Sequence, residues 1–330
     1  MPDLSFIIPV YNRPAEVKEL LDSLKAQLLK NFEIIIVEDG SDISSEEVVK
    51  SFMEDLPISY FVIPNGGPGQ ARNYGAQKAS GEYLIILDSD CILPPGYTEN
   101  VTKEIEQTKA DAFGGPDKAA DNFTTIQKAI NYSMTSFFTT GGIRGGKKKM
   151  DKFYPRSFNM GIKKEVYDKL NGFSTMRFGE DIDFSIRIYE AGYKVFLFPS
   201  AWVYHKRRTD WKKFFRQVYN SGIARINLYK RHPQSLKAVH LLPAVFSLGV
   251  LFLIIGSFFK WWFILPLPIY CLLIFIDSSI QNRNIKIGFY SIFAAFIQLI
   301  GYGCGFLSAV WKRIILKEGE FDAFKKSFYK

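Results

Sequence analysis

Residues 83–90 of the chain read YLIILDSD, an apolar run that ends in two carboxylates separated by one small residue. The run lies between a glycine and a pair of prolines, and an apolar segment of this length in that setting predicts a buried central strand. Such a strand would deliver Asp88 and Asp90 together at its carboxyl end, which is the edge where open α/β sheets bind their ligands.

Two carboxylates so close together repel each other, and a nearby cation would relieve the repulsion. A hard divalent cation such as Mg²⁺ or Mn²⁺ is the simplest candidate, because these ions prefer oxygen ligands. A solvated turn after the strand is the alternative, since aspartate and serine are also common turn residues. This stretch by itself leaves both interpretations open.

Three further apolar segments precede this run. Residues 4–10, 32–37 and 58–63 each predict a strand, and helical segments separate them. Strands that alternate with helices over short connections predict a mostly parallel sheet with helices on both faces. The first part of the chain is therefore expected to be an α/β domain that binds a nucleotide.

Three polar segments have both a functional and an ordinary explanation. Residues 65–69 (NGGPG) are not a phosphate-binding P-loop, because the Gly-Lys-Ser/Thr ending is missing, and their glycines are interpreted as permitting a turn. Residues 141–149 (GGIRGGKKK) suit a cationic lid over phosphates and equally a solvated loop. Glu180, Asp181 and Asp183 begin a predicted helix, whose dipole favours acidic side chains there whatever their function.

The net charge of +9 is concentrated in residues 147–149 and 205–237. A solvated basic face is the ordinary explanation, and anionic lipid or a phosphorylated ligand are the specific ones. Nucleic acid is not an expected partner, because no recognition motif accompanies the charge. The three cysteines are widely separated and predict no disulfide framework or zinc cluster. The first residues lead into a strand rather than a signal peptide, so the N-terminal part is expected in the cytoplasm.

The composition changes near residue 238. Residues 238–259 contain no Asp, Glu, Lys or Arg over 22 positions, which is long enough for a helix to cross the core of a bilayer. A second uncharged run, 261–276, has 16 positions and contains two prolines, and a third, 287–311, has 25 positions. The sequence predicts at least two membrane segments and leaves a third open.

The positive-inside rule can be applied to these three runs. The strongly basic flank at 206–237 is expected on the cytoplasmic side, and Arg283 with Lys286 would bring the chain back there after two crossings. A third crossing would place the tail outside, although the tail is basic too, with Lys312, Arg313, Lys317, Lys325 and Lys326. Either the third run folds back around residues 301–305, or it lies in the membrane interface, or the rule fails here.

Five segments, in this order, resemble the glycosyltransferases of family two. They are FIIPVYNRP (6–14), VEDGSD (37–42), GPGQARNYGAQKASGEYLIILDSD (67–90), FGEDIDFSIRIYEAGYKV (178–195) and VYHKRR (203–208). The resemblance covers roughly residues 3–210 and implies the GT-A fold, which is Rossmann-like, and a nucleotide-sugar donor. The same motifs say little about which sugar is transferred.

The resemblance implies a donor-binding role for each matching residue. The nucleoside would be cradled at the end of the first strand by Pro9, Tyr11 and Asn12. Asp39 matches an acid that hydrogen-bonds the base, commonly uracil, and Arg72 matches an arginine near the diphosphate. Asp88 would face the ribose. The basic side chains close to the phosphates would be Lys206, Arg207 and Arg208.

The resemblance further implies that Asp90 binds the metal, that His205 contacts metal or diphosphate, and that Asp181 is the catalytic base. These roles agree with the chemistry of sugar transfer. A nucleoside diphosphate leaves as an anion, which a cation and basic side chains stabilise. A carboxylate within reach can take the proton of an attacking hydroxyl. One base and a single displacement imply inversion at the sugar carbon.

Processive synthases of the family carry a Gln-x-x-Arg-Trp signature after the Glu-Asp pair, which residues 216–220 (RQVYN) lack. A single sugar addition is therefore favoured over chain elongation. The expected organisation is a catalytic domain over 1–210, a basic and aromatic interfacial segment over 211–236, and a membrane domain over 237–330. The middle segment suits a helix on the membrane surface and equally a helix packed on the catalytic domain.

The sequence thus predicts a metal-dependent, inverting glycosyltransferase of the plasma (inner) membrane, with its catalytic domain in the cytoplasm and a role in cell-envelope polysaccharide synthesis. The expected donor is UDP-linked rather than GDP-linked, and the expected acceptor is a lipid-linked saccharide or another glycan. A transferase that uses a polyprenyl phosphate itself as acceptor is the second hypothesis. A non-catalytic nucleotide-binding membrane protein is the third, and the co-occurrence of Asp39, Asp90, Asp181 and His205 argues against it.

Overall fold

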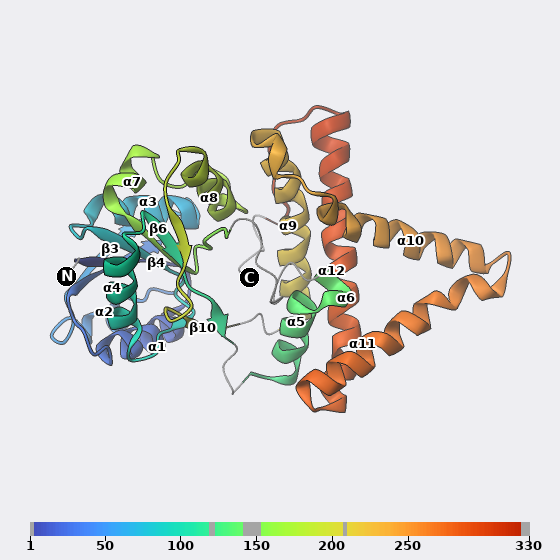
Figure 1. Cartoon of the computed structure of the whole chain (residues 1–330), viewed down its shortest axis with the longest axis horizontal. Coiled ribbons are helices and arrows are strands. Elements are labelled where there is room, and N and C mark those ends of the chain that lie inside the picture. The colour runs from blue at the N-terminus through green and yellow to red at the C-terminus, as the bar shows by residue number, and fades with distance from the viewer. Residues whose placement is uncertain (1–2, 119–122, 141–152, 207–209, 325–330) are drawn as a thin grey trace. The chain divides into compact units, whose positions relative to one another are not determined.

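The computed structural model describes residues 3–118, 123–140, 153–206 and 210–324. The chain forms two compact units (Figure 1), which are described separately. The first unit consists of Met1–Ala120 and Asp151–Lys206, and the second of Asp121–Met150 and Arg207–Lys330. The segment Asp121–Met150, which the sequence analysis placed in the catalytic domain, therefore groups with the C-terminal helices.

The described residues of the first unit form a seven-stranded sheet in the order β3-β2-β1-β4-β8-β6-β9. Strands β3, β2, β1 and β4 are parallel, β8 runs antiparallel to β4 and β6, and β9 is parallel to β6. The predicted mostly parallel sheet is confirmed. The strands are β1 (Leu4–Val10), β2 (Phe32–Asp39), β3 (Ile58–Ile63), β4 (Tyr83–Leu87), β6 (Ala112–Gly114), β8 (Asn159–Lys163) and β9 (Val195–Leu197).

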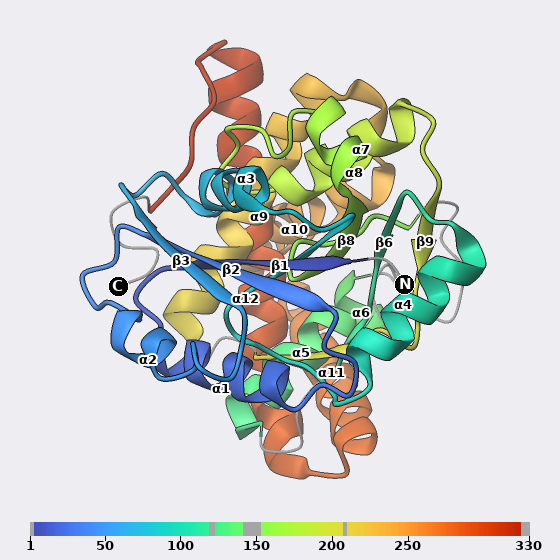
Figure 2. The same ribbon diagram turned by 90° about the vertical axis from the view of Figure 1, so that its left-hand side faces the viewer.

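Helices cover both faces of this sheet (Figure 2). One face carries α1 (Pro14–Lys25), α2 (Glu46–Lys50) and α4 (Tyr97–Thr108); the other carries α3 (Pro68–Lys78), α7 (Lys164–Lys169) and α8 (Glu180–Glu190). Because side chains alternate along a strand, Phe6 and Ile8 of β1 enter the first layer and Ile7 enters the second. Burial on both faces explains why the strands read as uninterrupted apolar runs.

A small second sheet follows the central strand. After Asp90 the chain enters β5 (Cys91–Ile92), which pairs antiparallel with β10 (Val203–His205), and β10 pairs with β7 (Asp117–Lys118). In this register His205 lies opposite Cys91. The pairing brings a residue from the end of the first unit next to the carboxyl end of β4.

The second unit is helical in its described residues. It begins with α5 (Thr125–Thr135) and α6 (Phe137–Thr140) and continues after the first unit with α9 (Trp211–Arg231), α10 (Leu242–Ser257), α11 (Pro266–Asn282) and α12 (Ile285–Ala309). Short helical turns connect or extend these helices: η1 (Pro233–Ser235), η2 (Ala238–Leu241), η3 (Trp261–Ile264) and η4 (Val310–Ile315). Three stretches are long and apolar enough to cross a membrane: Ala238–Ser257, Trp261–Asn282 and Ile285–Ile315.

The second of these stretches is longer than the predicted run over 261–276. Pro266 stands at the start of α11, where a missing amide hydrogen costs no helical hydrogen bond, so the proline begins the helix instead of breaking it. At the other end the helix passes through Asp277. The Asp277 carboxylate accepts hydrogen bonds from the Tyr132 hydroxyl of α5 at 2.6 Å and from Gln281 at 2.9 Å. A hydrogen-bonded acid is tolerated in an apolar helix, so the uncharged-run criterion ended the segment too early.

Glycines allow α9 and α12 to approach each other backbone to backbone. A Cβ atom on Gly222 would collide with the carbonyl oxygen of Tyr302, and one on Gly305 would collide with that of Tyr219. Backbone atoms cannot rotate out of the way as a side chain can. Side chains at these two positions are therefore incompatible with the observed distance between the helices.

The substitution Gly222→Ala is expected to lower the free energy of unfolding by about 1–3 kcal/mol, the usual cost of overpacking a close contact. The measurement is the thermal midpoint of the purified protein in detergent. Gly249→Ala in α10 is the matched control, because no atom lies within 4 Å of a Cβ there, and the better helix propensity of alanine should leave it neutral or slightly stabilised. Equal midpoints for the two variants would contradict the close packing of α9 on α12.

Candidate functional site

The predicted donor-binding residues lie at one edge of the large sheet. Pro9 is in β1, Tyr11 and Asn12 follow that strand, Asp39 ends β2, and Asp88 follows β4. Because β1 is parallel to both β2 and β4, the carboxyl ends of all three strands meet at the same edge. The structure therefore brings these five residues together, although they are distant in sequence.

The Asp39 carboxylate is held by the glycine-rich loop. It accepts hydrogen bonds from the backbone amides of Gly66 at 2.7 Å and Gly67 at 2.9 Å, and the Asn65 side chain donates to its backbone carbonyl at 2.7 Å. Burial raises the pKa of Asp39, and the two amide hydrogen bonds oppose that shift. The loop at 65–69 thus does more than permit a turn, because its amides orient the acid.

Asn12 connects the turn after β1 to the loop after β2 through hydrogen bonds. Its backbone has a positive φ of 55°, a conformation that asparagine adopts more readily than most residues. Its amide donates to the Ser41 hydroxyl at 2.8 Å, and its side-chain oxygen accepts from the amide of Ile43 at 2.8 Å. Through these contacts Asn12 stabilises the loop after β2 at the rim of the predicted nucleoside site.

Two basic side chains flank Asp90. The Nε2 atom of His205 lies 3.2 Å from one carboxylate oxygen, and Arg13 forms an ion pair with the other. The small sheet explains the position of His205, and the amide of Lys206 donates to the Asp90 carbonyl at 3.2 Å. The imidazole also stacks on the ring of Phe158, with 4.9 Å between centroids, which fixes its plane.

The residues around Asp90 fit a hard divalent cation. Ligand atoms of Asp90, Cys91 and His205 lie within 4.8 Å of one another. The Cys91 thiol is a poor ligand, because it is buried, it donates to the Phe158 carbonyl at 3.3 Å, and burial raises its pKa well above the usual value. A carboxylate and an imidazole remain as donors. Mg²⁺ and Mn²⁺ sites commonly have few protein ligands and complete their shell with water and phosphate oxygens.

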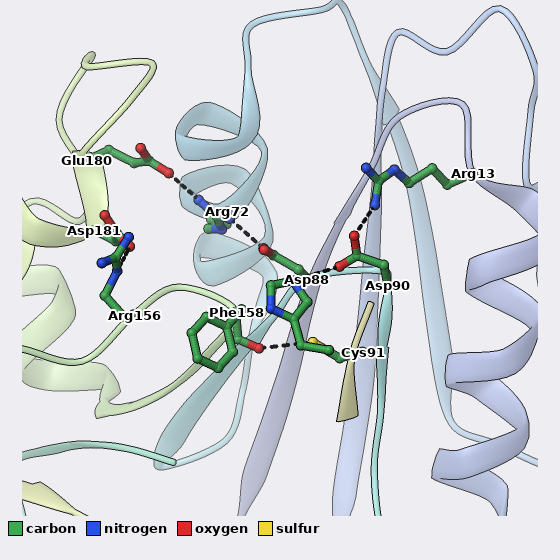
Figure 3. Close-up of polar contacts among 10 residues, drawn as sticks. Arg13, Arg72, Asp88, Asp90, Cys91, Arg156, Phe158, Glu180 and Asp181 are labelled. Carbon is green, nitrogen blue, oxygen red and sulfur yellow. Dashed lines mark hydrogen bonds and ion pairs between the residues drawn. The ribbon is translucent and has the colours of Figure 1, made fainter. Parts of the chain in front are cut away.

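Arg72 bridges the central strand and helix α8. Its side chain is 3% exposed and donates to Asp88 at 2.7 Å and to Glu180 at 2.9 Å (Figure 3). Burial alone would lower the pKa of the guanidinium, but the charges of Asp88 and Glu180 outweigh it and raise that pKa. The bridge fixes the first turn of α8, which contains Asp181, to the strand end that carries Asp88.

Asp181 is buried and paired with Arg156. The Arg156 Nε atom lies 2.5 Å from one carboxylate oxygen, and the other oxygen accepts from the amide of Ile182 at 2.8 Å. Burial opposes ionisation of Asp181, but the charge of Arg156 outweighs it and lowers the pKa of Asp181. The neighbouring Glu180 behaves in the opposite way, since burial and the Asp181 charge raise its pKa. Asp181 is thus held in the ionised form that a general base requires.

Of the three basic side chains predicted near the phosphates, the structure describes that of Lys206. Lys206 pairs with Glu19 of α1 at 2.6 Å. Arg207, Arg208 and the loop at 141–149 lie outside the described residues. Three site partners were not identified in the sequence analysis, namely Arg13 beside Asp90, Glu180 beside Arg72 and Arg156 beside Asp181. Arg13 and Glu180 stand within the quoted motifs, whereas Arg156 belongs to none of them.

The chain matches known glycosyltransferases in sequence. Residues 5–171 match the family described as glycosyl transferase family 2. An uncharacterized glycosyltransferase of Haemophilus influenzae is 33% identical over 193 residues, which are 56% of this chain and 61% of that protein. Glycosyltransferase GlyG of Streptococcus pneumoniae is 26% identical over 249 residues, 67% of this chain and 79% of that protein. The match thus spans less than two thirds of the Haemophilus protein.

Two solved structures share the fold over nearly the whole chain. The mannosyltransferase PcManGT from Pyrobaculum calidifontis, in complex with GDP-Man and Mn²⁺, has a TM-score of 0.62 and 18% identity, with 95% of this chain and 90% of that chain covered. S. aureus TarS 1-349, in complex with UDP, has a TM-score of 0.53 and 18% identity, with 96% and 92% covered. At these identities the likeness concerns the fold, which is GT-A-like.

Proposed function

Because the chain belongs to glycosyl transferase family 2, we propose that it is a membrane-anchored, inverting glycosyltransferase that adds one sugar to a lipid-linked saccharide or another glycan. The observation that carries the proposal is that the acidic side chains at one edge of the sheet come from two different places, the ends of parallel strands and the first turn of α8. Asp39, Asp88 and Asp90 follow parallel strands, while Asp181 is attached to the same edge through the Arg72 bridge. One carboxylate is thereby kept separate from those that would hold the donor.

The donor is proposed to be a UDP-linked sugar. Asp39, oriented by the glycine amides, would receive hydrogen bonds from the base, and Asp88 would face the ribose. The solved neighbours are complexes with GDP-Man and with UDP, so the fold accepts either nucleotide. The choice of uracil rests on the sequence resemblance around Asp39.

A Mg²⁺ or Mn²⁺ ion would be held by Asp90 and His205 and would stabilise the negative charge of the departing diphosphate. The Phe158 ring keeps the imidazole of His205 in the plane that faces Asp90. Arg13 neutralises the second oxygen of Asp90, which keeps the buried edge from accumulating negative charge.

Asp181 is proposed to take the proton from the acceptor hydroxyl as its oxygen attacks C1 of the sugar. The bond from C1 to the diphosphate oxygen breaks on the opposite face, and its electron pair leaves with the nucleoside diphosphate. One displacement of this kind inverts the configuration at C1. Arg156 holds the carboxylate in place and favours its ionised form.

A second acceptor class is favoured by the tight pairing of Asp181 with Arg156. An acid whose charge is already balanced is a weak base, and a polyprenyl phosphate has no proton to remove from its attacking oxygen at neutral pH. The two acceptor classes differ in their need for Asp181. Replacement of that residue therefore distinguishes them.

The proposed activity is tested with the purified full chain, Mn²⁺, a series of nucleotide sugars and membrane extracts as the source of acceptor. Release of a nucleoside diphosphate with transfer of the sugar is the expected result. A donor screen by thermal unfolding identifies the nucleotide, because a ligand at 100 times its Kd stabilises the folded state by about 2.7 kcal/mol. Metal-dependent nucleotide binding without turnover of any donor would overturn the catalytic assignment.

Chelation of divalent metal is expected to abolish turnover, and added Mn²⁺ or Mg²⁺ should restore it. His205→Asn should raise the Mn²⁺ concentration needed for half-maximal activity about 10-fold or more, because the site has few protein donors. The measurement is initial rate against free metal concentration for the two proteins. Unchanged activity in excess chelator would show that the reaction needs no divalent cation.

Arg156→Gln is expected to shift the acid limb of the pH–rate profile to higher pH. In the native protein Arg156 lowers the pKa of Asp181 against the opposing effect of burial. Without that charge, burial dominates, the pKa rises, and protonation removes the base at a higher pH than before. The check is kcat/KM from pH 5 to 9 for both proteins, and coincident acid limbs would disprove the coupling.

A further inference from the structure

Three helices of the second unit have the length and composition of membrane spans, yet three crossings conflict with the basic residues on both flanks. We propose that α12 does not cross the membrane. It lies along the membrane–water interface beside α9, and α10 and α11 alone cross as a hairpin. The tail after α12 then returns to the side of the membrane where α9 lies.

The first observation is that α9 and α12 lie side by side along most of their lengths (Figure 1). Near the start of both helices, Trp211 stacks on Tyr290 with 6.2 Å between ring centroids. In the middle, Gly222 meets the backbone of Tyr302. Near the end, the Arg313 guanidinium donates to the Asn227 side chain at 3.0 Å. The two helices therefore run in the same direction and occupy the same depth.

Helix α9 is too charged to accompany a membrane span. Its basic residues are distributed from one end to the other: Lys212, Lys213, Arg216, Arg225, Lys230 and Arg231. Each Lys or Arg at the centre of a membrane helix costs about 2.5–3.5 kcal/mol even on the most permissive scale. If α12 crossed the bilayer, α9, which packs along it, would have to cross as well. Both helices at the interface avoid that cost.

The second observation is that the tail contacts α9. The wholly buried side chain of Asn220 donates to the Ala323 carbonyl at 3.0 Å and accepts from the Ala323 amide at 2.9 Å. Further along, Asn227 donates to the Phe321 carbonyl at 3.3 Å, and Arg231 pairs with Glu320 at 2.8 Å. Since α9 precedes the first span and the tail follows the last helix, their contact requires an even number of crossings.

The third observation identifies the two helices that cross. In the most apolar windows of the first two candidate spans, 6% and 11% of the residues are buried within the protein, against 44% for the span that contains α12. The first candidate span, Ala238–Ser257, has 20 residues, so a helix of that length covers about 30 Å, the thickness of the hydrocarbon core. The second candidate span begins with Trp261 and Trp262, which are 67% and 50% exposed, and the Lys260 ammonium lies over the Trp262 ring. Tryptophan and lysine at a helix end are typical of the membrane interface.

The distribution of side chains on α12 agrees with an interfacial position. Ala294, Gly301 and Gly305 are buried on one side of the helix, whereas Phe289 and Phe293 are about half exposed. Interfacial helices combine an apolar face in the lipid with basic groups in water; here α12 supplies the apolar face, and the paired helix α9 supplies the basic groups. Arg283 before α12, Lys286 in its first turn, and Lys312 and Arg313 after it are then all on one side of the membrane. The positive-inside rule then holds for these flanks, with Lys260 as the single basic residue in the turn of the hairpin on the other side.

The proposal is tested by labelling single cysteines in the full chain, in sealed membrane vesicles of known orientation. The probe is a membrane-impermeant maleimide. The variants are Lys230→Cys at the end of α9, Phe259→Cys in the turn after α10, and Glu318→Cys in the tail, each in a background with Cys271→Ser and Cys304→Ser. Cys91 is retained because it is buried. Labelling after denaturation in detergent gives the total amount of cysteine that can react, against which the labelling of intact vesicles is compared.

Lys230→Cys and Glu318→Cys are expected to react from the same face, and Phe259→Cys from the opposite face. Reaction of Glu318→Cys from the face of Phe259→Cys would establish three crossings and overturn the proposal. Failure of Phe259→Cys to react from the face opposite Lys230→Cys would show that the hairpin does not cross, and would also overturn it. As a second measurement, green fluorescent protein or alkaline phosphatase is fused to the C-terminus of the chain, which is otherwise unchanged. The fluorescent-protein fusion should fluoresce, and the phosphatase fusion should be inactive. The reverse result, together with labelling of Lys230→Cys from the cytoplasmic face, would contradict the even number of crossings.

Discussion

Asp181→Asn is expected to lower kcat about 10²–10⁴-fold, which is the usual contribution of a positioned general base. Asparagine has nearly the same shape, so the hydrogen bond from the amide of Ile182 can persist. What is lost is the ability to accept a proton from the acceptor hydroxyl. Because donor binding does not involve this carboxylate in the proposed reaction, the donor KM should change little.

Asp183→Asn is the matched control for this prediction. Asp183 lies two residues further along the same helix, is also buried, and pairs with Arg187 at 3.1 Å. Its replacement should affect stability rather than turnover per folded molecule. If Asp181→Asn retained native turnover, an acceptor without an ionisable hydroxyl proton would be indicated, and the polyprenyl-phosphate hypothesis would replace the hydroxyl acceptor. Loss of turnover in both variants would point to disruption of α8 instead of loss of a base.

Arg72→Met is expected to cause the largest loss of stability among single substitutions at the site, about 3–5 kcal/mol. The guanidinium is almost completely buried and is the partner of both Asp88 and Glu180. Removing it leaves the Glu180 carboxyl group, which is 9% exposed, and the partly exposed Asp88 carboxyl group without their shared cation. Glu180, whose pKa is already raised, would then be protonated at neutral pH.

The measurement is chemical or thermal unfolding of the purified protein. Lys18→Met is the control, because Lys18 pairs with Asp22 at 2.8 Å on the exposed surface of α1. Exposed pairs of this kind contribute roughly 0–1 kcal/mol. Similar losses in the two variants would mean that Arg72 contributes no more than a surface ion pair, and that the bridge does not hold α8 in place.

The first four strands could be predicted because each is a long apolar run with polar residues at its ends. The predicted strands at 4–10 and 58–63 coincide with β1 and β3. Strand β8 has no such pattern, since its sequence is NMGIK. It exists because Gly161 has no side chain and the ring of Phe113 occupies that space. A strand defined by a contact with another strand cannot be read from its own residues.

The same distinction separates the site residues that were predicted from those that were not. Asp39, Asp88 and Asp90 follow recognisable strands, so the sheet topology alone brings them together. Arg156 lies 25 residues before its partner, Asp181, in a segment without a strand or helix that would indicate its direction. Only the folded chain shows that its guanidinium reaches α8. Asp181 was predicted as the base from its motif, but Arg156, which lowers the pKa of Asp181, was not predicted.

The hydrogen bond between Tyr132 and Asp277 joins residues 145 positions apart, and this separation constrains the order of events during synthesis. Ribosomes add roughly 5–20 residues per second, so α5 leaves the ribosome about 7–30 seconds before α11 does. In that interval Ala129 and Ile130, which are buried in the finished protein, still lack Ala294 of α12, a member of their hydrophobic cluster. The nascent chain must therefore keep α5 from aggregating until translation of the hairpin is complete, and a pause or premature stop before α11 would leave a fragment for degradation.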